Sequence, residues 1–143
     1  MSWVIDTCVL LDIALGDPKF AIGSAQALDR LREEGLVACP VTLVEIAPAL
    51  GGRPDAARTF CAGIGIPLDT VWTADDTLAG MKAWNAYVAA KRAGLSAKRP
   101  IADILIGAFA QRRRGLITRN AAEFRRWFGA LTIVDPAKPV RRR

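Results

Sequence analysis

Histidine is absent from this chain, cysteine is scarce and long apolar runs do not occur, and each absence excludes a class of protein. With no histidine among 143 residues, the chain cannot carry a Ser-His-Asp triad, a Cys-His nucleophile pair or a histidine-bearing zinc site. Its three cysteines are an odd number without paired spacing, which favours a reducing, cytoplasmic setting over a disulfide scaffold. No stretch approaches the roughly 20 apolar residues that cross a membrane, so we expect no membrane partner.

The glycine-rich motifs of nucleotide-binding proteins are also missing, because neither Gly-x-x-x-x-Gly-Lys-Ser/Thr nor a strand-borne Gly-x-Gly-x-x-Gly occurs. The composition, with 52% hydrophobic and 24% charged residues, is typical of one soluble globular domain. We expect this domain to cover residues 1–135. Residues 136–143 contain two prolines and three consecutive arginines and are predicted to form a basic, mobile C-terminal tail.

Charge is distributed unevenly along the chain. Residues 1–90 contain six Lys and Arg against eleven Asp and Glu, whereas residues 91–143 contain fourteen Lys and Arg against three acids. The excess of positive charge in the C-terminal part indicates a polyanionic partner such as nucleic acid. Solvated helix faces and a loose tail are the alternative explanation of the same clusters.

The apolar pattern predicts strands that alternate with helices. The predicted strands cover residues 2–7, 36–39, 66–71, 116–118 and 131–134. The predicted helices cover about residues 24–34, 40–50, 55–61, 74–93, 100–114 and 121–128. Ser24 and Thr73 are the expected N-cap residues of the first and the fourth helix. This alternation is typical of an α/β fold, in which helices cover both faces of a parallel sheet and ligands bind outside the carboxyl ends of its strands.

Three carboxylates interrupt apolar sequence that is expected to be buried. Asp6 follows Val-Ile, Glu45 lies within Val-Thr-Leu-Val-Glu-Ile, and Asp103 lies within Ile-Ala-Asp-Ile-Leu-Ile. A lone buried carboxylate is costly and normally becomes protonated, pairs with a cation or binds a metal. Several together repel one another unless a cation lies between them. The three acids therefore favour a divalent metal held by oxygen ligands.

Each of these acids also has a purely structural explanation. Asp6 could cap the following helix through its side chain. Glu45 follows Thr42 at the spacing of a capping box, in which the acid bonds back to a free backbone N–H. Asp103 lies near a helix start, where its charge would complement the helix dipole. No single acid is decisive, and the joint pattern is the stronger indication.

Further polar residues divide into site candidates and ordinary helix residues. Asn120 and Glu123 follow the fourth predicted strand, where they are site candidates or the N-cap and N3 residues of the next helix. We expect Asp12 to be solvated or to cap a helix. Asp75 and Asp76 fit the first turn of the helix that Thr73 caps, an ordinary dipole arrangement.

Four blocks of the sequence, in order, resemble the blocks of PIN-domain nucleases. They are Val-Ile-Asp-Thr-Cys-Val-Leu-Leu at 4–11, Thr-Leu-Val-Glu-Ile at 42–46, Pro-Ile-Ala-Asp-Ile-Leu-Ile-Gly-Ala at 100–108 and Leu-Ile-Thr-Arg-Asn-Ala-Ala-Glu-Phe at 116–124. Each block is weak alone, but together they span essentially the whole chain. The resemblance implies a three-layer α/β/α sandwich with a short central parallel sheet.

Chain length and the Thr-Arg-Asn ending look most like VapC toxins of toxin–antitoxin pairs. That resemblance implies a ribonuclease that depends on Mg²⁺ or Mn²⁺, with one or two ions. It also implies a homodimer that a small cognate antitoxin protein neutralises. By the same resemblance, Asp6, Glu45 and Asp103 are the catalytic acids and hold the metal. Thr7 and Thr118 would shape the site.

The fourth acidic position departs from the commonest PIN pattern. This chain has Asn120 where many PIN domains have Asp, and it has Glu123 at the later position where others place the acid. Either Glu123 reaches into the site or the second metal position is weak. Both residues are therefore candidate catalytic residues, and the number of metal ions stays open.

Metal-assisted hydrolysis of RNA phosphodiester bonds is the mechanism that these expectations imply. Asp6 and Asp103 would bind one ion, and Glu45 would bind it or orient its water. The basic C-terminal half would hold the RNA backbone. The candidate nucleic-acid contacts are Lys98, Arg99, Arg112, Arg113, Arg119 and Arg125.

Two alternatives remain open. A non-catalytic PIN-like module that binds nucleic acid or an antitoxin would explain Asn120. A phosphomonoesterase with Asp6 as nucleophile is disfavoured, because that chemistry commonly uses a second acid two residues later, where this chain has Cys8.

Overall fold

The computed structural model describes residues 1–94 and 100–138. The predicted nucleic-acid contacts Lys98 and Arg99, and residues 139–143 of the predicted tail, lie outside these residues. The helices of the described chain are α1 (Thr7–Ala14), α2 (Ala21–Leu31), α3 (Pro40–Glu45), α4 (Pro54–Ile64), α5 (Ala74–Arg92), α6 (Ile101–Gln111) and α7 (Ala121–Trp127), with the short 3-10 helices η1 (Arg32–Glu34) and η2 (Ala47–Leu50).

Four short strands of the described chain form one parallel sheet. They are β1 (Trp3–Ile5), β2 (Leu36–Val37), β3 (Gly115–Ile117) and β4 (Ile133–Val134). Their spatial order is β2-β1-β3-β4, and every neighbouring pair is parallel. The protein is therefore a mixed α/β protein with a short parallel sheet, as the sequence pattern predicts.

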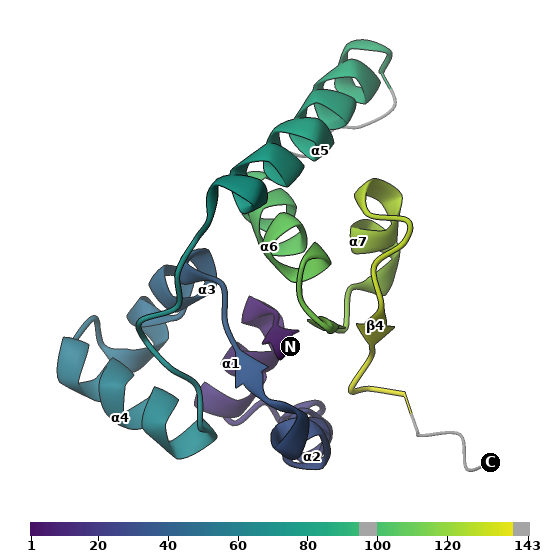
Figure 1. Cartoon of the computed structure of the whole chain (residues 1–143). Helices are drawn as coiled ribbons and strands as arrows, with labels where there is room; N and C mark the ends of the chain where they lie inside the picture. The colour runs from purple at the N-terminus through teal and green to yellow at the C-terminus, as the bar shows by residue number, and fades with distance from the viewer. Residues whose placement is uncertain (95–99, 139–143) are drawn as a thin grey trace.

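Side chains alternate between the two faces of the sheet and build a core on each. Val37, Val4 and Leu116 form one row across the strands and pack with α5, α6 and α7. Ile5 and Ile117 form the next row on the opposite face and pack with α1, α2 and α4. Figure 1 shows the same division, with α5, α6 and α7 on one side of the sheet and α1, α2 and α4 on the other. The sheet is thus the middle of three layers.

Three parts of the first half differ from the predicted elements. Helix α1 directly follows β1 and has no counterpart among the predicted helices. Ser24 does not cap a helix, because it is buried within α2 and its hydroxyl donates to Asp12. The predicted strand 66–71 is irregular. Pro67 has no backbone N–H to pair there, and Val71 is 69% exposed.

The helices of the second half begin where the sequence predicts. The Thr73 hydroxyl accepts the N–H of Asp76, and the Asp76 carboxylate accepts the N–H of Thr73, which completes a capping box at the start of α5. Helix α6 begins directly after Pro100, and α5 and α6 lie side by side (Figure 1). No helix within residues 1–94 and 100–138 is long and apolar enough to cross a membrane.

Candidate functional site

Asp6 is a buried carboxylate at the carboxyl end of β1, with 4% of its surface exposed. Its Oδ1 accepts the backbone N–H of Thr7 at 2.7 Å. Its Oδ2 accepts the hydroxyl of Thr118 at 2.7 Å and the thiol of Cys8 at 3.3 Å. The first bond makes Asp6 the N-cap residue of α1. The structural and the functional explanations of Asp6 are therefore compatible, since one oxygen caps the helix and the other lies beside Thr118.

Glu45 is joined to the same site through Thr7. The Thr7 hydroxyl donates to Glu45 Oε1 at 2.7 Å and lies 3.0 Å from the hydroxyl of Thr42. Helix α3 begins at Pro40 and ends at Glu45, so Thr42 is not an N-cap residue and the predicted capping box is not formed. Glu45 is thus an exposed carboxylate at the end of α3, joined through Thr7 to the residue next to the buried Asp6.

The negative charge of Asp6 is unfavourable when no cation is near, because the carboxyl is buried and Glu45 carries a like charge. Burial raises the pKa of the Asp6 carboxyl above its ordinary value, and the negative charge of Glu45 raises it further. Hydrogen bonds from Thr118, Cys8 and the N–H of Thr7 oppose this rise, because they favour the charged form. A positive charge beside both acids would remove their mutual repulsion.

Asp103 lies in the first turn of α6, as predicted, and is half-buried. Its turn is near the start of α3, because Ile104 lines an apolar groove together with Pro40 and Val41. Among the residues that the structure describes, no three acidic or cysteine side chains are grouped closely enough to hold a metal ion. The structure therefore brings Asp6 and Glu45 together, and the set of three carboxylates stays a prediction.

The segment after β3 supplies a third part of the site. Thr118 is fully buried, and its hydroxyl accepts the N–H of Asn120 at 2.9 Å while it donates to Asp6. The Asn120 side chain is exposed and does not cap α7, although the residue occupies the N-cap position. Glu123 is half-buried in the first turn of α7. Both remain candidates for the fourth position.

A buried ion pair lies next to the site. The Asp12 carboxylate is 4% exposed and accepts hydrogen bonds from Nε and Nη2 of Arg119 at 2.8 and 2.9 Å. The Arg119 guanidinium also lies 3.8 Å from the centre of the Phe20 ring. The expectation that Asp12 is solvated or caps a helix is wrong. Arg119 is held in a structural ion pair with Asp12, and its contact with nucleic acid stays a prediction. The signal for burial is present in the sequence, since Asp12, like Asp6, interrupts an apolar run.

Two more of the predicted nucleic-acid contacts are paired with acids. Arg113 donates to Asp76 at 3.0 Å, and its guanidinium lies 3.4 Å from the centre of the Phe109 ring. Only 19% of its side chain is exposed. Arg112 pairs with Asp75 at the surface. These contacts join the end of α6 to the start of α5. Arg113 therefore stabilises the fold, and the nucleic-acid contacts of Arg112 and Arg113 stay predictions.

Oxygen donors make up the site, and the thiol beside them has a raised pKa. Burial, assisted by the charge of Asp6, raises the pKa of Cys8 to about 12, so this thiol stays protonated at neutral pH and is a poor nucleophile. The carboxylates of Asp6 and Glu45, with the adjacent threonine hydroxyls, are the hard ligands that Mg²⁺ and Mn²⁺ prefer. In donor chemistry, the residues present fit a hard divalent cation.

Comparisons with known proteins identify no relative of this chain. No family model matches the chain, and no curated protein and no solved structure is significantly similar to it. The resemblance to PIN-domain nucleases therefore rests on the four sequence blocks. The mixed α/β fold with its short parallel sheet is the part of that resemblance that the structure confirms.

Proposed function

We propose that the protein is a metal-dependent endoribonuclease of the VapC type, which hydrolyses RNA phosphodiester bonds. The observation that carries the proposal is the buried carboxylate of Asp6, which lies beside Glu45 at the carboxyl edge of a parallel sheet and has a raised pKa. Ligands of α/β proteins bind at this edge, and acids with perturbed pKa values concentrate at functional sites. The basic C-terminal half and the four PIN-like blocks support an RNA substrate.

Carboxylates hold the metal in this proposal. Asp6, Glu45 and Asp103 bind one Mg²⁺ or Mn²⁺ ion, and Asn120 or Glu123 completes the position for a second. When bound, the ion supplies activation of a water molecule and offsets the negative charge that builds on the phosphate.

Threonine hydroxyls fix the two acids that the structure brings together. Thr118 holds the Asp6 carboxylate through a bond of 2.7 Å, and Thr7 holds Glu45 through another of 2.7 Å. Both acids are therefore oriented before substrate arrives, which lowers the entropic cost of reaching a reactive geometry.

Cleavage of total cellular RNA by the purified, antitoxin-free protein tests the proposal. Wild-type protein, Asp6→Ala and the matched variant Asp29→Ala, which changes an exposed acid of α2, are each incubated with Mg²⁺, Mn²⁺ or EDTA. We expect discrete fragments from wild type and Asp29→Ala with either metal, and none with EDTA or from Asp6→Ala. Metal-dependent fragments from Asp6→Ala, or none from folded wild-type protein in either metal, would contradict the proposal.

A second candidate is a non-catalytic module of the same fold that binds nucleic acid or an antitoxin. Two observations favour it. Within residues 1–94 and 100–138 no group of three acids is assembled, and Asn120 replaces an acid at the fourth position. RNA binding without cleavage in either metal would establish this candidate.

The proposal includes two protein partners, a second copy of the chain in a homodimer and a small cognate antitoxin. An apolar groove between α3, α5 and α6 supports a protein partner, because the exposed side chains of Met81 and Ile101 line it. Light scattering after gel filtration measures the dimer, and a monomer at all concentrations would contradict it. The proposal also places the protein in the cytoplasm, which its three free cysteines support.

A further inference from the structure

A cavity of about 370 Å³ lies between α2, α7 and the segment that follows β4. Three cations from three different elements line it: Arg30 from α2, Arg125 from α7 and Lys138 from the segment after β4. We propose that this cavity, the basic pocket, binds a phosphate group of the RNA backbone a few nucleotides from the cleaved bond. The inference deepens the proposed function and rests on it for the identity of the nucleic acid.

The three cations of the basic pocket are not held in any ion pair between residues that the structure describes. All three are exposed, and none forms an ion pair within the part of the chain that the structure describes. By contrast, Arg113 and Arg119 are held by buried acids. The acid that lines the pocket is Asp135, whose carboxylate accepts the N–H of Ala137 at 2.9 Å. Three cations against one acid leave the pocket with a positive excess.

The register of the sheet places the basic pocket on the same edge as Asp6. Ile117 is aligned with Ile5 on one neighbouring strand and with Val134 on the other. Asp6 is the residue after Ile5 of β1, and Asp135 is the residue after Val134 of β4. Both therefore leave the sheet at its carboxyl edge. Two strand spacings separate their backbones, or about 10 Å, a distance that a few nucleotides of single-stranded RNA span.

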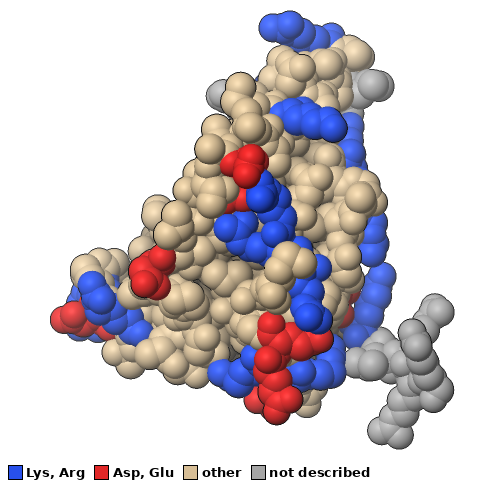
Figure 2. All heavy atoms as spheres, in the orientation of Figure 1, with Lys and Arg blue, Asp and Glu red and all other residues tan. Residues whose placement is uncertain are grey.

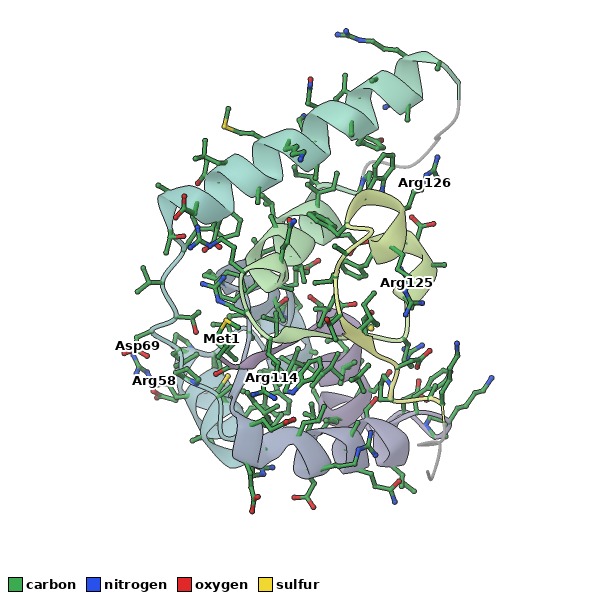
Figure 3. The ribbon with its side chains drawn as sticks, turned by 45° about the vertical axis from the view of Figure 1, so that its right-hand side comes forward. Met1, Arg58, Asp69, Arg114, Arg125 and Arg126 are labelled. Atoms are coloured by element: carbon green, nitrogen blue, oxygen red, sulfur yellow. The ribbon has the colours of Figure 1, made fainter. Side chains whose placement is uncertain are left out.

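Phosphate is the anion that this group of side chains suits. Guanidinium groups bind phosphate oxygens with two parallel hydrogen bonds, and a lysine adds a point charge. Figure 2 shows Lys and Arg side chains along the edge of the molecule that α7 and β4 occupy. In Figure 3 Arg125 points from α7 down the side of β4, whereas Arg58 lies on the opposite side of the molecule. A backbone that passes the Asp6 site along this edge would meet the pocket.

Binding of RNA in EDTA tests the pocket without cleavage. Two variants lose the same charge, because each has three cations changed to Gln. The pocket variant carries Arg30→Gln, Arg125→Gln and Lys138→Gln. The control variant changes three exposed cations away from the pocket and carries Arg53→Gln, Arg58→Gln and Lys82→Gln.

Fluorescence anisotropy of a labelled, short single-stranded RNA gives the dissociation constant at several KCl concentrations. We expect the pocket variant to bind about fivefold more weakly at low salt, with a salt slope smaller by about 1, and the control variant to change little. Equal losses in both variants, or no loss in the pocket variant, would overturn the proposal. Unchanged RNA affinity together with loss of a co-purified protein would assign the pocket to an acidic protein segment and would also overturn it.

Measuring RNA cleavage alongside RNA binding distinguishes failure of the basic pocket from failure of the proposed nuclease activity. Single-turnover reactions of wild type and of the control variant with Mg²⁺ show whether the protein cleaves RNA, independently of where the RNA binds. If wild type binds RNA through the pocket but cuts none, the nuclease proposal fails and the pocket stands. If wild type cuts RNA and the pocket variant binds RNA like the control, the pocket alone fails.

Discussion

The hydroxyl of Thr118 donates a hydrogen bond of 2.7 Å to the carboxylate of Asp6, a residue 112 positions earlier in the chain. The N–H of Asp6 in turn donates to the carbonyl of Ile117 at 3.0 Å. The same Thr118 hydroxyl accepts the N–H of Asn120. One buried threonine therefore joins the ends of the two central strands and orients the acid that the proposed chemistry needs.

Replacing Thr118 should reveal this double role. Thr118→Val should lower the free energy of unfolding by about 1–3 kcal/mol, because it leaves the N–H of Asn120 without its acceptor and the buried Oδ2 of Asp6 with only the weak thiol donor of Cys8. Thr118→Ser keeps the hydroxyl and should retain most of the stability. Urea denaturation measures both variants, and RNA cleavage should fall in the same order. Wild-type stability in Thr118→Val would contradict the role assigned to the hydroxyl.

Asp6→Asn should stabilise the metal-free protein near neutral pH, because it removes a charge whose burial is unfavourable. The pKa of Asp6 is raised in the folded state, so its protonated form contributes stability that is fully present below the ordinary pKa of 3.8 and lost as the pH rises through the raised value. The gain in Tm of Asp6→Asn over wild type should therefore grow with pH across that range and then level off. Calorimetry in EDTA measures it, and a gain that shrinks with rising pH would be inconsistent with this sign.

Magnesium should make the Tm of wild type higher than that of Asp6→Asn. A ligand that binds only the folded state raises Tm, so Mg²⁺ should raise the Tm of wild type and leave that of Asp6→Asn unchanged. Asp29→Asn, a change of an exposed acid, should respond like wild type. An equal response in all three would show that the ion does not bind at Asp6. This readout does not depend on cleavage.

Asp12→Ala should destabilise the protein strongly, by about 3–5 kcal/mol, because it leaves the partly buried guanidinium of Arg119 without its partner. Asp29→Ala breaks an exposed pair with Arg32 and should cost less than about 1 kcal/mol. Denaturation followed by tryptophan fluorescence compares the two. Similar losses would mean that the pair of Asp12 and Arg119 is no stronger than a surface contact.

Two glycine-to-alanine changes should have opposite signs. A Cβ at Gly107 of α6 would collide with the ring of Phe128, so Gly107→Ala should cost about 1–3 kcal/mol. A Cβ at Gly63 of α4 would meet no atom within 4 Å, so Gly63→Ala should stabilise the protein by about 0.5–1 kcal/mol. Urea denaturation measures both. A tolerated Gly107→Ala would mean that α6 and α7 are less closely packed than described.

The fold follows from local signals where those signals are strong. Thr73 with its acid three residues later, and Pro100 before an apolar helix, mark helix starts that the structure confirms. Helix α1 is different, because its apolar residues are consecutive rather than spaced along one face. From sequence alone, such a run cannot be distinguished from a continuation of the preceding strand. The cap that Asp6 forms and the packing on α2 and α3 stabilise it as a helix.

The site was predictable in part for a related reason. Strand ends in a parallel sheet meet at one edge, so an acid after the first strand and a Thr after a later one can be expected to lie close. The apolar neighbours of Asp12 indicate its burial, but its partner Arg119 lies 107 positions away. That pairing depends on the register between β1 and β3, which no local pattern in the sequence encodes.

The thiol of Cys8, whose pKa lies near 12, has a consequence for oxidative chemistry. Burial also raises the pKa of Cys39, to about 11, and that of Cys61. Reagents that attack thiolates therefore find almost none in the folded chain at neutral pH, and they modify it through conformations that have opened locally. The rate at which Cys8 is alkylated thus reports how often the junction of β1 and α1 opens.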